Sequence, residues 1–139
     1  MWSIFYITNN EDNNIKTIEE VIGMKILNQI IALLSCSTPK VILPIIRTLG
    51  NIINGTDLHA QAVIDAGAIQ ALYPLLNHPI KLIRKEACWA YSNLLAGVPS
   101  QVKDVFDYDG GKVIDALFDR LMNDEIEVKL LYFHFFIKF

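Results

Sequence analysis

Three pairs of side chains stand four residues apart and join an aromatic or cationic residue to a polar one. They are Trp2 with Tyr6, Arg47 with Asn51, and Trp89 with Asn93. Residues four apart share one face of a helix. An asparagine amide can both donate to and accept from the backbone of an extended peptide. A Trp ring can hold the stem and cation of Lys or Arg, at about 0.5 to 2 kcal/mol per contact. The pairs therefore indicate a face that binds an extended basic peptide.

Two charged residues qualify this prediction. Glu86 precedes Trp89 by three residues, so it lies on the same helix face and can neutralise a cation stacked on the indole. Arg47 would repel a Lys-rich ligand, and we expect it to order acidic neighbours across the face instead. For Trp89 a core aromatic remains an alternative, although the accompanying Asn93 argues against it because a buried amide needs partners.

An internal repeat indicates which structural units must position these pairs. Val21-Ile22 recurs 42 residues later as Val63-Ile64, and Leu33-Leu34 recurs at the same interval as Leu75-Leu76. A third copy starts at Val105-Phe106 and carries about three extra residues within 108–111. A period in the low forties indicates a solenoid of stacked units.

Within each unit the pattern is helical. Apolar residues recur at three-to-four spacing over segments 17–34 and 57–76, the second with a turn at 65–67. Asn54-Gly55 and Ala96-Gly97 are expected to end long helices. Prolines stand where helix starts are expected, since a missing N–H costs little there: Pro39, Pro44 and Pro79. Each unit is predicted to be a short helix, a second helix and a long third helix that bears the polar pairs.

Two or three helices per unit of this length are typical of HEAT and armadillo solenoids. We expect an all-α fold, a right-handed armadillo-repeat superhelix of about three repeats, whose core accounts for most Leu, Ile and Val residues. The predicted divisions are 1–10 for the end of one repeat, 15–55 and 57–98 for two repeats, and 100–139 for an incomplete, divergent repeat.

Composition removes several classes of protein. With 53% hydrophobic residues, the 139-residue chain is too apolar to be disordered. A net charge of −3 argues against nucleic-acid binding, which needs a basic footprint. Outside the C-terminus the longest apolar run, 30–34, is far short of the roughly 20 residues that cross a bilayer, and no signal peptide is readable. Cys36 and Cys88 are expected to be reduced thiols of a cytosolic or nuclear protein.

No catalytic, metal or cofactor site is predicted. The histidines lack metal-ligand spacing, and Asp109–Lys112 lacks the spacing and following hydroxyl of a phosphate loop. Two carboxylate pairs are interpreted as solvated helix ends or loops: Glu19-Glu20 and Asp124-Glu125. The chain is therefore not expected to be an enzyme.

Three segments resemble consecutive armadillo repeats of the importin alpha family: 45–57, 63–68 and 85–93. The resemblance rests on Gly50-Asn51-Ile52 followed by Gly55-Thr56-Asp57, and on Glu86-Ala87 followed by Trp89 and Ser92-Asn93. A Trp and Tyr four apart in one repeat, then an Arg and Asn in the next, is also similar to that family.

The resemblance implies an adaptor that carries basic nuclear localisation signals into the nucleus and shuttles between cytoplasm and nucleus. It implies importin beta and an export receptor as further partners. The implied contacts with a signal peptide, in the family's minor groove, are Trp89, Asn93, Ser92, Glu86, Gly55, Thr56 and Asp57, on a face that also bears Asn51, Arg47, Trp2 and Tyr6. For Asp57, an N-cap of a helix over 58–64 is an equal alternative.

The chain departs from the family pattern at its C-terminal end. His134 and Lys138 stand where a further Trp and Asn are expected, and Leu131 stands where a Glu is expected. Two alternatives therefore remain open. One is a generic armadillo scaffold for another extended peptide, and the other is the product of an incomplete gene with an unrelated tail over 130–139. The overall acidic balance favours basic peptides as ligands.

Overall fold

The computed structural model describes residues 3, 5, 8, 14–35 and 38–129, and all regular elements among them are helices. The first helices of the units are α2 (Asn14–Gly23), α5 (Asp57–Asp65) and α8 (Pro99–Asp107). The second layer consists of α3 (Leu27–Ala32) with η1 (Leu33–Ser35), α6 (Ala68–Leu72) with η2 (Tyr73–Asn77), and α9 (Lys112–Asn123), which follows η3 (Tyr108–Gly111). The long helices are α4 (Pro39–Ile53) and α7 (Lys81–Leu95).

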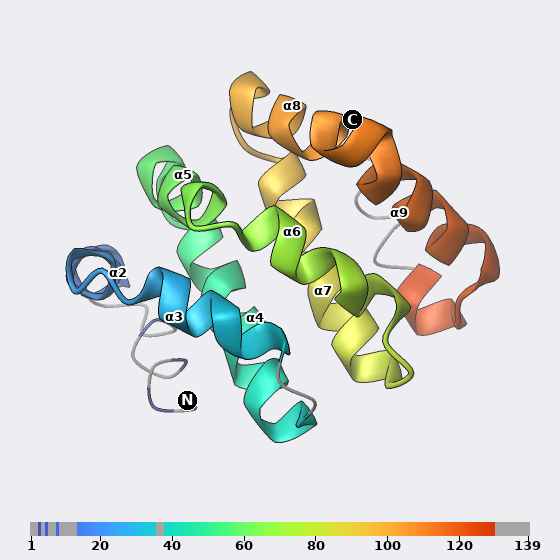
Figure 1. Cartoon of the computed structure of the whole chain (residues 1–139), viewed down its shortest axis with the longest axis horizontal. Coiled ribbons are helices and arrows are strands. Elements are labelled where there is room, and N and C mark those ends of the chain that lie inside the picture. The colour runs from blue at the N-terminus through green and yellow to red at the C-terminus, as the bar shows by residue number, and fades with distance from the viewer. Residues whose placement is uncertain (1–2, 4, 6–7, 9–13, 36–37, 130–139) are drawn as a thin grey trace.

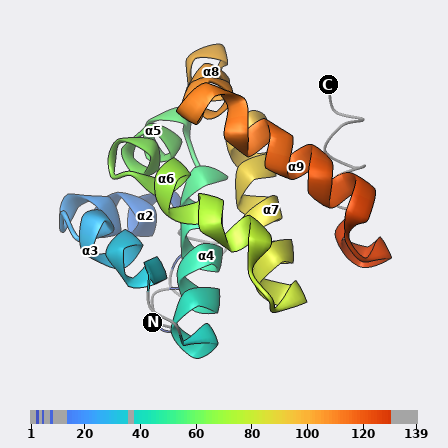
Figure 2. The ribbon, with the colours of Figure 1, turned by 45° about the vertical axis from the view of Figure 1, so that its right-hand side comes forward.

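Equivalent helices of successive units pack on one another. α2 contacts α5, α5 contacts α8, α3 contacts α6, and α4 contacts α7. Figure 1 shows α3 crossing in front of α4 and α6 crossing in front of α7, and Figure 2 shows the same helices after rotation. The described part of the chain is an α-solenoid, as the repeat predicts. The division at 1–10, 15–55, 57–98 and 100–139 stays a prediction.

The core follows the repeat. Val63 and Val105, 42 residues apart on α5 and α8, are both fully buried. Tyr91 on α7 is fully buried as well, and its hydroxyl donates to the carbonyl oxygen of Ile69 at 2.6 Å. Burial raises the pKa of Tyr91 well above its ordinary value. This hydrogen bond joins the third helix of a unit to its second helix.

The turn between first and second helices recurs at the 42-residue interval. Gly67 adopts φ of +92°, as the predicted turn at 65–67 requires, and Lys25 adopts φ of +54° at the equivalent point. Segment 17–34 is therefore broken after Gly23, although its apolar spacing gave no sign of the break. The sequence does not mark this turn, because Lys25 and not a glycine adopts the left-handed conformation there.

Pro44 corrects one prediction about helix starts. Pro39 is the first residue of α4, as expected, but Pro44 lies inside the helix and is buried. Its ring has no N–H to donate to the carbonyl of Lys40, so one helical hydrogen bond is lost. The apolar surroundings of α4 accommodate the ring within the core.

Asp124 corrects another prediction, since it is not a solvated carboxylate. Its side chain is 1% exposed, and the Arg84 guanidinium on α7 donates to both carboxylate oxygens at 2.8 Å. These hydrogen bonds from Arg84 hold the pKa of Asp124 below its usual value of 3.8, against the effect of burial. The bidentate pair ties α7 to the chain just after α9.

We expect Asp124→Asn to lower the free energy of unfolding at pH 7 by about 3 kcal/mol, because it leaves the Arg84 cation without its buried partner. The folded pKa of Asp124 is depressed, so this stabilisation is present above pH 3.8 and is lost as pH falls through the folded pKa. Urea unfolding followed by circular dichroism should show the difference from wild type shrinking below about pH 4.

The exposed Asp104 provides the matched control, because Asp104→Asn removes the same charge from α8. A loss of stability in Asp104→Asn as large as that in Asp124→Asn would show that net charge, and not the pair, is responsible.

Candidate functional site

The predicted site residues of the third helices come together on one face. Arg47 of α4 contacts Glu86 of α7, and further along both helices Gly50 of α4 contacts Trp89 of α7. The contacts keep the same order along both helices, so α4 and α7 run parallel. Figures 1 and 2 show them side by side. We define the α4–α7 face by Arg47, Asn51, Glu86, Trp89 and Asn93.

Gly50 supports the Trp89 ring. A Cβ added to Gly50 would lie 2.1 Å from Cζ3 of Trp89 and 2.7 Å from its Cε3. The indole therefore lies directly on the α4 backbone, at a spot that only glycine leaves open. Trp89 is half-buried, so it is in part a packing residue and in part a surface that a ligand can reach.

The asparagines form hydrogen bonds across the repeats. Asn93 Nδ2 donates to the Gly50 carbonyl oxygen at 3.3 Å, and Asn51 Nδ2 donates to Thr8 Oγ1 at 3.3 Å. Each side-chain amide has a second N–H and a carbonyl oxygen. Both residues are half-buried, so these groups can serve a bound peptide. Ser92, by contrast, donates its hydroxyl to the carbonyl of Trp89 at 2.7 Å.

The two charged residues of the face form an ion pair. Arg47 Nε and Nη2 donate to Glu86 Oε1 at 2.9 and 2.7 Å. The Arg47 guanidinium also lies 5.9 Å from the centroid of the Phe5 ring. Arg47 orders an acidic neighbour across the repeats, which is the contact expected from the sequence.

The loop before α5 provides its N-cap, and of the two alternatives left open for Asp57 the cap role is wrong. Thr56, not Asp57, is the N-cap: its hydroxyl accepts from His59 N at 3.3 Å, and His59 Nδ1 accepts from Thr56 N at 3.2 Å. Asp57 is the exposed first residue of α5, where its charge favours the helix dipole. Gly55 is exposed, and a Cβ there would meet His59 Nδ1 at 2.6 Å.

Some predicted residues lie outside the described part of the chain. These are Trp2 and Tyr6, and also the departures at Leu131, His134 and Lys138. Cys36 is outside it as well, whereas Cys88 is a buried thiol. Phe5 and Thr8 are described, and they lie against Arg47 and Asn51.

The long helices α4 and α7 carry a net positive charge, whereas the whole chain has a net charge of −3. Glu86 is the one carboxylate of α4 and α7, which carry five cationic residues: Lys40, Arg47, Lys81, Arg84 and Lys85. Two of these cations are held by acids from beyond α9, since Lys81 pairs with Glu125 and Glu127, and Arg84 pairs with Asp124. The acidic balance of the whole chain therefore does not originate on the α4–α7 face.

Other candidate sites are sparse. Within the described ranges, no group of three or more His, Cys, Asp or Glu side chains could hold a metal ion, and no helix is long and apolar enough to span a membrane.

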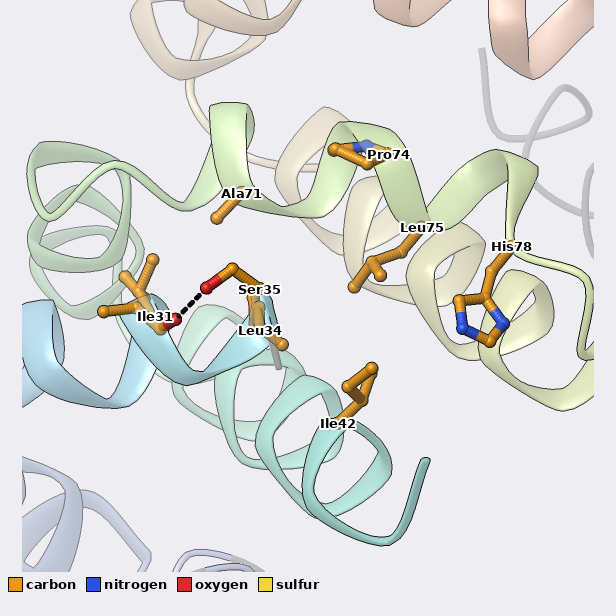
Figure 3. A pocket seen from close by; sticks show the side chains of 9 residues that line it. Ile31, Leu34, Ser35, Ile42, Ala71, Pro74, Leu75 and His78 are labelled. Atoms are coloured by element: carbon orange, nitrogen blue, oxygen red, sulfur yellow. Dashed lines mark hydrogen bonds between the residues drawn. The ribbon is translucent and has the colours of Figure 1, made fainter. Parts of the chain in front are cut away.

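An apolar pocket of about 480 Å³ lies where η1, α4, α6 and η2 meet (Figure 3). Its wall includes Ile31, Leu34, Ile42, Ala71, Leu75 and His78.

Comparison with known proteins gives the family. The model of the armadillo/beta-catenin-like repeat matches residues 56–96. Importin subunit alpha-1a of Oryza sativa subsp. japonica is 35% identical over 107 residues, which cover 76% of this chain and 20% of that protein. Importin subunit alpha-3 of Arabidopsis thaliana is 40% identical over 89 residues, covering 63% and 16%. The chain is an armadillo-repeat protein related to the importin alpha subunits.

Solved structures agree on the fold of this armadillo chain. A designed armadillo repeat protein in complex with peptide (KR)4 superposes with a TM-score of 0.87 at 24% identity, covering 97% of this chain and 54% of that one. An engineered protein superposes with a TM-score of 0.79 at 27% identity, covering 96% and 61%. The armadillo chain spans only 16% to 20% of the two importin subunits described above. The relatives named above are importin subunits and the fold is that of armadillo repeats, in agreement with the prediction that the chain is not an enzyme.

Gly50 is the site residue that sequence reasoning missed. In the sequence it stands out only as part of a segment that resembles importin alpha. It lies in the last turn of α4, and glycine within a helix is destabilising by roughly 0.5 to 1 kcal/mol relative to alanine. A glycine within an apolar helix, followed 39 residues later by a Trp in the equivalent helix of the next repeat, is the signal that could have found it.

We expect Gly50→Ala to lower the free energy of unfolding by about 1 to 3 kcal/mol, because the new Cβ displaces the Trp89 ring. Urea unfolding measures this loss. Trp89 emission, recorded in a Trp2→Phe background, should shift to longer wavelength as the ring becomes solvated.

Gly23→Ala is the control. Gly23 ends α2, and a Cβ added there meets nothing within 4 Å. Equal free energies of unfolding for Gly50→Ala and Gly23→Ala would show that the packing of Trp89 does not require a glycine at position 50.

Proposed function

We propose that the armadillo chain forms part of the peptide-binding groove of an importin-alpha-type adaptor, which binds basic nuclear localisation signals for import into the nucleus. Asn51 and Asn93 hold the backbone of the extended signal, and Trp89 packs against the stem of a Lys or Arg. Ser92, Gly55, Thr56, Asp57 and Arg47 border the path of the peptide, and the sequence pattern predicts that Trp2 and Tyr6 extend it. The full adaptor engages importin beta and an export receptor and shuttles between cytoplasm and nucleus.

The observation that carries this proposal is the arrangement of Trp89 and Asn93 over Gly50. Both side chains are half-buried and anchored to the α4 backbone, so their positions are set before a ligand arrives. A pre-organised site loses less conformational entropy on binding. The relatedness to importin alpha subunits of plants supports basic signals as the ligand class.

A second candidate function is an armadillo scaffold for a neutral or acidic extended peptide. The charge of α4 and α7 favours it, because Glu86 is their one carboxylate among five cations and is already paired with Arg47. The asparagine contacts are independent of ligand charge. The two candidates therefore differ in the charge of the preferred peptide.

A titration with three labelled octapeptides of matched length separates them: (KR)4, (ED)4 and (GS)4. The adaptor predicts that fluorescence anisotropy detects micromolar binding of (KR)4 that weakens as salt rises, with weaker binding of the other two. Binding of (ED)4 or (GS)4 as tight as that of (KR)4 would contradict the adaptor function and support the scaffold function.

The double variant Trp89→Ala/Asn93→Ala tests the site itself. We expect it to raise the Kd for (KR)4 at least about tenfold, which corresponds to roughly 1.4 kcal/mol. Phe118→Ala/Asn123→Ala on α9 removes an aromatic and an amide elsewhere and should leave the Kd unchanged. An unchanged Kd in the Trp89/Asn93 variant, with its helical content intact, would exclude this face as the binding site.

A further inference from the structure

The α4–α7 face holds one cation of its own in the place where a ligand cation is expected. Arg47 reaches from α4 to α7 and donates two hydrogen bonds to Glu86 Oε1, at 2.9 and 2.7 Å. The Arg47 guanidinium also lies over the Phe5 ring, 5.9 Å from its centroid. Arg47 thus has an aromatic ring and a carboxylate as neighbours, the two kinds of group that Trp89 and Glu86 would offer to a cation of a peptide.

The acid is the less accessible member of this pair. The Glu86 side chain is 14% exposed and that of Arg47 is 29% exposed, so the cation is the more accessible member of the pair. Along α4 and α7 there is no second carboxylate. A ligand cation that approaches Glu86 therefore meets an ion pair without net charge, in which the repulsion from Arg47 offsets the attraction to Glu86.

We propose that Arg47 is an internal competitor for Glu86 and a determinant of ligand specificity. It weakens the binding of Lys or Arg beside Trp89, so that the preference for a basic over a neutral peptide is smaller than Glu86 alone would give. A basic ligand gains the full attraction of Glu86 only when Arg47 moves off it. The inference rests on the proposed function, because it concerns the same peptide site.

Arg47→Met tests the proposal, since methionine keeps an unbranched stem against Phe5 and removes the charge. We expect the variant to bind (KR)4 about three- to tenfold more tightly than wild type, as Glu86 becomes available for a charge-assisted hydrogen bond. Adding Glu86→Gln to Arg47→Met should abolish the gain. The affinity for (GS)4 should not change.

Lys103→Met controls for net charge. Lys103 lies on α8, pairs with Asp107 there, and its loss changes the chain by the same single charge. A gain in this variant equal to that of Arg47→Met would overturn the proposal. Circular dichroism of all variants establishes that they are folded.

Two further outcomes are informative. If wild type binds (KR)4 and Arg47→Met binds it equally or less tightly, Arg47 positions Glu86 for the ligand, and the competitor role is wrong while the proposed function stands. If neither protein binds (KR)4, the proposed function fails and the inference fails with it.

Discussion

The Trp89 ring lies on the bare backbone of Gly50, and this contact constrains how the two long helices meet. It brings α7 against α4 in a parallel register that also places Asn93 beside the Gly50 carbonyl and Glu86 beside Arg47. A side chain of any size at position 50 would separate the helices or expel the ring. The positions of Glu86, Trp89 and Asn93 therefore depend on the absence of a Cβ atom at residue 50.

The α4–α7 face is built from side chains that also hold the repeats together. Trp89 packs on α4 yet is only half-buried, and each asparagine donates one N–H to the segment one repeat earlier. In a solenoid each repeat contacts only its neighbours. The hydrogen bonds of Asn51 and Asn93 both reach back 43 residues, so these contacts recur with about the structural period.

Charge pairs between repeats set the electrostatics of the long helices. Arg47 with Glu86 and Arg84 with Asp124 each join residues about one repeat apart, and in both pairs an Arg donates two hydrogen bonds to a carboxylate that is more buried than itself. These contacts neutralise the acids locally. The net charge of the chain consequently says little about the charge that a ligand would meet.

The sequence by itself determined the helical class, the 42-residue period and the ends of the long helices, because apolar spacing and Asn-Gly or Ala-Gly stops act within a few residues of the chain. It also placed Arg47, Asn51, Glu86, Trp89 and Asn93 on shared helix faces. Only the tertiary structure decided that Gly50 supports Trp89, that Thr56 rather than Asp57 caps α5, and that Asp124 is buried against Arg84. The Gly50 and Asp124 contacts join residues about 40 positions apart, which local sequence patterns do not reveal. Thr and Asp are both common N-cap residues, so the sequence alone does not say which of Thr56 and Asp57 caps the helix.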